Sequence, residues 1–297
     1  MRTPGVAVGT EHLAGALPEV AVPRRVPFWT VPTYALLVVV LAVICAPLVW
    51  MALAAFKTRT ETYSLPISWL PTQMRWENYQ QAWTSVPFER YFMNSLVVTV
   101  LGSALKVVNG VLTAYALAFL HFPRKNLVFL FVLAALMVPE EVTVIPNFVL
   151  ISNLGWVNTY QGIIIPGAGV AFGTFLMRQH FLTLPREVLE AARIDGAGHL
   201  RLLWSIVLPM SRPTVVTFVL ITVVAKWNEY FWPLLVATDD KTRTLPLGLT
   251  QLQNSEGHTE WGVVMAGAVL VIAPVLALFL WSQRHIVEGL TAGSVKG

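Results

Sequence analysis

Hydrophobic positions in this sequence gather in long runs that carry no formal charge. Residues 34–56 and 261–283 contain no Asp, Glu, Lys or Arg. Each run exceeds the roughly 20 residues that a helix needs to cross a ~30 Å hydrocarbon core. A third run, residues 91–120, is interrupted by a single charge, Lys106. These runs predict three membrane-spanning helices.

The middle of the chain holds further apolar runs that are less cleanly separated. Residues 127–139 are followed by Glu140 and Glu141, and residues 142–177 then carry no formal charge. That stretch is too long for one helix, and the polar residues within 152–161 indicate a turn that divides it. Together with a fifth run, the pattern predicts six spans, at about 34–56, 91–120, 127–147, 161–178, 211–237 and 261–283.

Composition excludes a water-soluble domain. Hydrophobic residues make up 56% of the chain and charged residues 12%, whereas soluble domains carry about 25% charged residues. The net charge is +4, but the basic residues flank apolar runs instead of clustering, which indicates membrane orientation and no nucleic-acid partner. The predicted fold class is therefore an all-α membrane protein with six transmembrane helices.

The distribution of Lys and Arg predicts which side each loop faces. With six spans and a cytoplasmic amino terminus, the inside segments hold twice as many Lys and Arg as the outside loops, as cytoplasmic loops usually do. We therefore expect both termini on the cytoplasmic side of the inner cell membrane. Residues 1–26 lack periodicity and are predicted to be a disordered cytoplasmic tail, followed by a transmembrane permease domain over 27–297. The first apolar run is too long for the ~7–15-residue core of a cleaved signal peptide.

The cytoplasmic segment between the fourth and fifth spans, residues 179–209, is too long for a simple connection. Thr183, Pro185 and Glu187 supply helix-start signals: a capping hydroxyl, a proline in the first turn and an acid near the positive end of the dipole. Gly196 and Gly198 then permit a sharp turn. We predict a short helix-turn-helix on the cytoplasmic face, suited to docking a soluble partner.

This segment resembles the EAA loop of ATP-binding-cassette (ABC) importer permeases. The matching residues are Glu190, Ala191, Ala192, Gly196, Ile206, Leu208 and Pro209, with Asp195 beside the glycine. The resemblance implies a type I ABC importer permease (MetI-like) fold with a cytoplasmic coupling helix. In such permeases Glu190 would pair with an arginine of the ATPase, and the bend at Gly196 would seat the coupling helix in a cleft on it.

Motifs elsewhere narrow the resemblance to the carbohydrate-uptake branch, in the subunit equivalent to the second maltose permease. They are Asn94-Ser95, Val138-Pro139 with Ile145-Pro146, residues 174–179, Trp227-Asn228-Glu229-Tyr230 and residues 289–297. Within the branch, residues 227–235 and the 284–297 end most resemble actinobacterial glycerol-3-phosphate or glycerophosphodiester permeases, which implies such a substrate. The alternatives are a maltose- or trehalose-type sugar permease and, from a different class, an ion-gradient-driven secondary carrier.

The resemblance also implies partners. The chain lacks a Walker glycine loop and other catalytic motifs, so it is expected not to be an enzyme, to bind no metal or cofactor, and to leave ATP and Mg to a partner ATPase dimer. A second related permease, an extracytoplasmic solute-binding protein that contacts the loop 238–260, and membrane lipid complete the expected partners. The carboxyl-terminal tail would enter the ATPase interface through Gly293, Ser294, Val295 and Lys296.

Charged and polar residues inside the spans are candidates for the translocation path. Lys106 could face the path, pair within the bundle or extend to the interface. Lys226 and Glu229 lie three apart on one helix face, which favours a structural ion pair over a path role. Glu140 and Glu141 are expected at the outer end of the third span, facing water, with a path-lining role left open. The candidate path residues are Lys106, Trp227, Asn228 and Glu229, with an interface-belt position as the alternative for the tryptophan.

Overall fold

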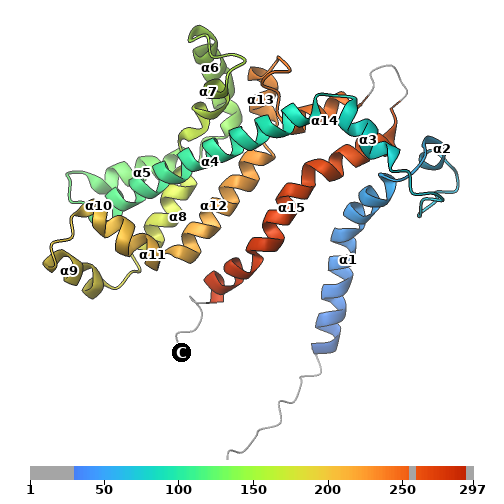
Figure 1. The fold of residues 1–297 in the computed structure, drawn as a ribbon. Coiled ribbons are helices and arrows are strands. Elements are labelled where there is room, and N and C mark those ends of the chain that lie inside the picture. Colours follow the sequence, from blue (N-terminus) through green and yellow to red (C-terminus); the bar gives the residue numbers. More distant parts are fainter. Residues whose placement is uncertain (1–29, 254–258, 292–297) are drawn as a thin grey trace, which may run out of the picture. The chain divides into compact units, whose positions relative to one another are not determined.

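The computed structural model describes residues 30–253 and 259–291, which form helices and contain no β-strand (Figure 1). They belong to two units, Met1–Pro47 and Leu48–Gly297, and helix α1 crosses the boundary between them. The α-helices are α1 Thr30–Ala54, α2 Arg59–Thr62, α3 Glu77–Thr84, α4 Phe88–Phe119, α5 Lys125–Ala135, α6 Glu140–Asn153, α7 Tyr160–Ile164, α8 Ala171–Phe181, α9 Arg186–Ile194, α10 His199–Leu202, α11 Leu208–Met210, α12 Arg212–Trp227, α13 Phe231–Val236, α14 Leu245–Gln251 and α15 Trp261–Thr291. A 3-10 turn, η1 Pro166–Ala168, follows α7, and a π-helical turn, η2 Leu203–Val207, follows α10.

Three helices in the described part of the chain are long and apolar enough to cross a membrane by themselves. They cover Val31–Ala54, Phe88–Phe119 and Trp261–Gln283. Three bent pairs of helices are long and apolar enough only when each pair is taken together: α5 with α6, α7–η1 with α8, and α10–α11 with α12–α13. Counting each pair as one span gives up to six within residues 30–253 and 259–283, in agreement with the predicted six-span, all-α membrane fold.

Proline accounts for the sharpest of these bends, 95° between α5 and α6. Pro139 is the N-cap of α6 in an extended conformation, and a proline disfavours helical geometry in the residue before it. The turn after α5 is tightened by a bond from the Met137 amide to the Ala134 carbonyl (3.0 Å). One straight helix over 127–147 is therefore not observed, and Glu140 opens a new helix where the positive end of the dipole favours a carboxylate.

The spans expected over 161–178 and 211–237 are also interrupted. In the first, Pro166 and the extended Gly169 separate α7 from α8, with a bend of 46°. In the second, α12 ends at Trp227 and α13 begins at Phe231. The amide of Asn228 and its side-chain Nδ2 both donate to the Val224 carbonyl, at 3.2 and 2.9 Å, so Asn228 satisfies the end of α12.

Helices α4, α8 and α12 form the centre of the Leu48–Gly297 unit and meet around one aromatic ring. Phe218 of α12 is buried between Gly110 of α4 and Gly173 of α8. A Cβ at Gly110 would lie 2.9 Å from the ring, and one at Gly173 only 2.0 Å. Small residues let helices in a membrane approach closely, and here two glycines make the space for Phe218.

The segment between α1 and α3 is organised by one carboxylate, Glu61. The Thr58 amide donates to its Oε2 (2.8 Å), the Thr72 amide donates to its Oε1 (2.8 Å), and the Thr72 hydroxyl donates to the same Oε1. The Thr72 hydroxyl, followed by the backbone N–H groups of Thr58 and Thr72, holds the pKa of Glu61 at about 2, below its ordinary 4.5. These bonds favour the charged form.

We predict that Glu61 titrates near pH 2 in the folded protein. Because its folded pKa is depressed, the stability that it contributes is fully present above about pH 4.5 and is lost as the pH falls through about 2. The measurement is the carboxyl ¹³C shift of labelled glutamate in detergent-solubilised protein, assigned with Glu61→Gln. Thr72→Val is expected to move the midpoint upward, whereas a wild-type midpoint near 4.5 would contradict the hydrogen-bonding role.

Candidate functional site

The segment that resembles an EAA loop begins with α9. Pro185 is the N-cap, and Glu187 lies in the first turn as predicted. The prediction for Thr183 is wrong: its hydroxyl donates to the His180 carbonyl (2.7 Å) and does not cap α9. The His180 carbonyl also accepts the Thr183 amide (2.9 Å), so Thr183 belongs to the end of α8. Pro185 precedes the first turn of α9 instead of lying within it.

Helix α9 ends in a Schellman motif built on Gly196. This residue has a φ of 78°, the left-handed region in which glycine carries no Cβ penalty. The Gly196 amide donates to the Arg193 carbonyl (3.0 Å) and the Ala197 amide to the Ala192 carbonyl (2.9 Å). Asp195, the residue before Gly196, is the C-cap. The sharp turn expected at this glycine is therefore a defined helix end that satisfies two carbonyls.

One face of α9 is packed on the transmembrane helices. Leu189 and Ala192 are buried in the same hydrophobic cluster as Tyr115 of α4, Phe181 of α8 and Leu202 of α10. Apolar side chains three residues apart lie on one helix face, so this pair fixes the rotation of α9. We call residues 179–209 the coupling segment, after the resemblance; its helix α9 is held against α4 and α8 as part of their core.

The opposite face of the segment is exposed and mixes charged with large apolar side chains. Glu190, Ala191 and Asp195 are exposed. The large apolar side chains exposed with them are Val188, Ile194, Leu200 and Trp204. Exposed apolar groups beside a charge are typical of a surface that binds another protein. Figure 1 places α9 and α10 at one end of α4, with α3 and α14 at the other end.

The last matching residues connect the segment to α12. Ile206 lies in the π-helical turn η2 and Leu208 in α11, both packed against the central cluster, while Pro209 is exposed. Pro209 has no N–H to donate to the preceding turn. The Ser211 amide then bonds to the Val207 carbonyl (3.0 Å), and the chain bends by 86° into α12. A π-helical turn of this kind often marks a functional position.

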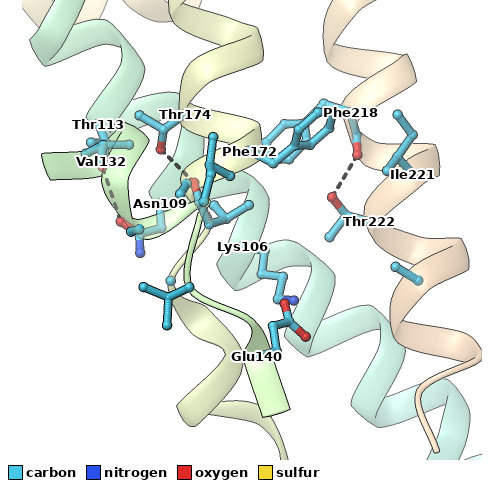
Figure 2. Close-up of a pocket in the computed structure, with 17 residues that line it drawn as sticks. Lys106, Asn109, Thr113, Val132, Glu140, Phe172, Thr174, Phe218, Ile221 and Thr222 are labelled. Carbon is cyan, nitrogen blue, oxygen red and sulfur yellow. Dashed lines mark hydrogen bonds between the residues drawn. The ribbon is translucent and has the colours of Figure 1, made fainter. Parts of the chain in front are cut away.

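A cavity of about 620 Å³ lies among α4, α5, α8, α12 and the start of α6 (Figure 2). Its polar lining residues are Lys106, Asn109, Thr113, Glu140, Thr174 and Thr222. The hydroxyls of Thr174 and Thr222 donate to carbonyls of their own helices, each at 2.8 Å. The Nδ2 of Asn109 donates to the Ala168 carbonyl (3.1 Å). Figure 2 shows Lys106 and Glu140 pointing toward the same side of the cavity.

The predicted ion pair between Lys226 and Glu229 is confirmed, with 2.5 Å between Nζ and Oε2. Lys226 is buried and also donates to the Ile163 carbonyl (3.3 Å), whereas Glu229 is one-quarter exposed. A Cβ at Gly102 would lie 2.8 Å from the Lys226 Cε. The missing side chain at Gly102 therefore leaves room for the methylene chain of Lys226. The ion pair joins the last turn of α12 to the short segment that precedes α13.

Removing one partner of this pair is expected to destabilise the fold. Glu229→Gln would leave the buried Lys226 ammonium without an anionic partner, which in a fully buried pair costs about 3–5 kcal/mol and costs less here because Glu229 is one-quarter exposed. Thermal unfolding in detergent measures the loss. The double variant Lys226→Met/Glu229→Gln is expected to recover much of it, and a double variant no better than the single would contradict the pairing.

Three of the four candidate path residues, Trp227, Asn228 and Glu229, do not line the cavity. Trp227 is 5% exposed and its Nε1 donates to the Val271 carbonyl (3.0 Å) in a cluster with Phe88 and Tyr91. It therefore belongs to the core between α4, α12 and α15, and not to a belt at the membrane interface. Asn228 is exposed and caps α12.

The structure gives Asn94 and Ser95 a role that sequence reasoning missed. The Asn94 Nδ2 donates to the carbonyls of Lys241 (3.0 Å) and Arg243 (2.8 Å), and the Ser95 Oγ accepts the Leu245 amide (2.7 Å). These bonds hold the loop before α14 against α4, at the end opposite α9. The available signal was an adjacent pair of polar residues early in an apolar run.

Several predicted features lie outside the described residues. They are the amino-terminal tail 1–26 and the carboxyl-terminal Gly293, Ser294, Val295 and Lys296. The roles predicted for these parts remain predictions.

Comparison with known proteins gives a consistent picture. Residues 106–291 match the family described as binding-protein-dependent transport system inner membrane component. The sn-glycerol-3-phosphate transport system permease protein UgpE of Yersinia enterocolitica serotype O:8 / biotype 1B is 36% identical over 264 residues, covering 86% of this chain and 94% of the relative. The protein of the same name from Escherichia coli O1:K1 / APEC is 36% identical over 271 residues, covering 89% and 96%.

Solved structures share the fold. A chain from the crystal structure of a bacterial ABC transporter involved in the import of the acidic polysaccharide alginate aligns with a TM-score of 0.77 at 23% identity, over 86% of this chain and 95% of that chain. The family match spans more than half of the sequence and includes α9, the Gly196 turn and the cavity helices. The chain therefore belongs to the family of binding-protein-dependent transport system inner membrane components, and it is a multi-pass ABC transporter permease.

Proposed function

We propose that this permease carries sn-glycerol-3-phosphate or glycerophosphodiesters such as glycerophosphocholine into the cell. The observation that carries the proposal is 36% identity, over 86–89% of the chain, to permeases named for sn-glycerol-3-phosphate transport. The solved alginate transporter has the same fold at 23% identity, so a sugar or oligosaccharide of the maltose or trehalose type is the alternative substrate.

We infer that a separate ATPase dimer docks on the coupling segment and holds the ATP and Mg. The exposed Glu190 would pair with an ATPase arginine, and the apolar Ile194 and Leu200 beside it would be buried in the contact. Support comes from the packing of Leu189 and Ala192 on the opposite face, because a rigidly held helix transmits displacement to the spans. The tail residues Gly293–Lys296 would add a second contact in the ATPase interface.

We propose two further partners for this permease. A second related permease would complete the translocation path, and an extracytoplasmic solute-binding protein would contact the loop 238–260. The Asn94 and Ser95 bonds to this loop support that role, because a fixed loop can press on a partner. In this arrangement α9 and both chain termini face the cytoplasm of a cell with the complex in its inner membrane.

Uptake by the assembled complex tests the proposal. The complex would be purified from native membranes through a tag on this chain, reconstituted in vesicles with its binding protein, and supplied with ATP. We expect uptake of labelled sn-glycerol-3-phosphate that persists after the proton gradient is collapsed. Uptake that needs the gradient would identify a secondary carrier, and uptake of maltose or trehalose in its place would identify a sugar permease.

A further inference from the structure

The cavity contains a positive charge without an ionic partner. Lys106 is partly exposed on its wall, and no carboxylate forms an ion pair with it among residues 30–253 and 259–283. Glu140 lines the same cavity and points toward Lys106 in Figure 2, but it stands in the first turn of α6, where that helix's own dipole favours it. An ammonium group in a membrane span is energetically unfavourable and is usually kept for a function.

A second positive element of the cavity is the N-terminus of α8. This helix has eleven residues, its N-cap Val170 offers no side-chain hydrogen bond, and its first turn contains no acidic residue. Gly169, Val170 and Ala171 line the cavity. The first N–H groups of a helix lack intrahelical acceptors, and together with the dipole they favour an anion such as phosphate.

A second lysine approaches the same place from α12. The position that a Cβ would take at Gly167 lies 3.7 Å from the Lys226 Nζ and 3.9 Å from the Lys106 Nζ. Glu229 neutralises Lys226, whose side chain is almost fully buried. Of these two lysines, Lys106 is the one that forms no ion pair within residues 30–253 and 259–283, and the missing side chain at Gly167 leaves space beside it.

We propose that Lys106 and the N-terminus of α8 form a subsite for the phosphate group of the translocated substrate. The inference rests on the proposed function and adds to it the residues that recognise the anion. A phosphate monoester carries close to two negative charges at pH 7, which an ammonium and free helix N–H groups match. The hydroxyls of Thr174 and Thr222 donate to carbonyls, so their oxygens can accept from the glycerol hydroxyls.

The test compares two substrates in the reconstituted complex. One is sn-glycerol-3-phosphate, nearly a dianion, and the other is glycerophosphocholine, whose single phosphate charge is balanced by choline. For Lys106→Gln we expect uptake of sn-glycerol-3-phosphate to fall about tenfold or more and that of glycerophosphocholine to fall less. Lys106→Arg should retain most uptake. Arg90→Gln, which removes an exposed charge from the same helix outside the cavity, should change neither.

A second variant distinguishes loss of the subsite from misfolding of Lys106→Gln. Ala171→Asp places a carboxylate in the first turn of α8, which favours the helix but competes with a phosphate. It should reduce sn-glycerol-3-phosphate uptake selectively, while ATP hydrolysis stimulated by the loaded binding protein reports intact assembly. If both variants carry the two substrates as well as the wild type does, the subsite is wrong while the proposed function stands.

Two further results would also overturn the subsite. One is an equal loss for both substrates together with loss of bound phospholipid from Lys106→Gln in native mass spectrometry, which would assign the site to a lipid headgroup. The other is a wild-type complex that transports neither sn-glycerol-3-phosphate nor glycerophosphocholine. That result would refute the proposed function on which the inference rests, and the subsite with it.

Discussion

Replacing Glu190 by lysine is expected to abolish ATP-driven uptake while the permease itself stays folded. Glu190 is exposed on α9, and the buried Leu189 and Ala192 on the other face hold the helix in place. An exposed substitution changes stability by roughly 0.5 kcal/mol or less. At the ATPase contact, however, the lysine would face the partner's arginine, and like charges across an interface cost several kcal/mol.

Two readouts separate docking from folding in this experiment. Uptake and stimulated ATP hydrolysis in vesicles should both fall to background, while the melting temperature of the purified permease should change little. Glu190→Gln, which removes the attraction without adding repulsion, is expected to retain partial uptake. Glu187→Lys makes the same charge change one turn earlier on α9 and should retain more uptake than Glu190→Lys. Full uptake by Glu190→Lys would refute the docking role.

Gly173→Ala is expected to have the largest effect on the fold. A Cβ at this position would lie 2.0 and 2.1 Å from two atoms of the buried Phe218 ring. Gly110 also lies close to the ring, so the ring could relieve the clash only by turning toward the cavity that it lines. Overpacking of a core typically costs about 1–3 kcal/mol, and more where nothing can shift. We expect a marked fall in melting temperature and in the yield of assembled complex.

Matched variants test whether the cause is the contact with Phe218. Gly169→Ala adds the same methyl group four residues earlier, where no atom lies within 4 Å and the backbone is ordinary, and it should leave the melting temperature unchanged. Phe218→Leu should partly rescue Gly173→Ala, giving a coupling between the two sites. Destabilisation that Phe218→Leu fails to relieve would place the clash elsewhere.

Much of the architecture was accessible from the pattern of charges alone. Spans such as 34–56 and 261–283 could be read directly because lipid tolerates few charged residues. The bends were harder to predict, because Pro139 ends one apolar run, Pro166 lies inside another, and proline is tolerated in membrane helices. Hydropathy reports how apolar a segment is and carries no information about its direction. The Thr183 cap failed for a related reason: one hydroxyl can serve either of two adjacent helix ends.

At the candidate site, contacts between residues close in the sequence could be predicted, and contacts between distant segments could not. The Lys226–Glu229 pair could be expected because its residues are only three apart in the sequence, although Glu229 lies just beyond the end of α12 and not on the helix as predicted. The surroundings of Lys106 could not, since the N-terminus of α8 and Glu140 reach it from distant parts of the sequence. For the same reason, the burial of Trp227 against Val271 was not foreseen. Non-local contacts of this kind require the folded structure.

Phe218 lies close both to the bend before α12 and to the cavity. Phe218 lies one and a half to two helical turns beyond the 86° bend that joins the coupling segment to α12, and it is also part of the cavity wall. Any tilt imposed on α10 and α11 by a moving partner would therefore swing this ring relative to Gly110 and Gly173. If a partner docks on α9 and α10 as proposed, such a tilt would shift Phe218 and so change the width of the cavity that it lines.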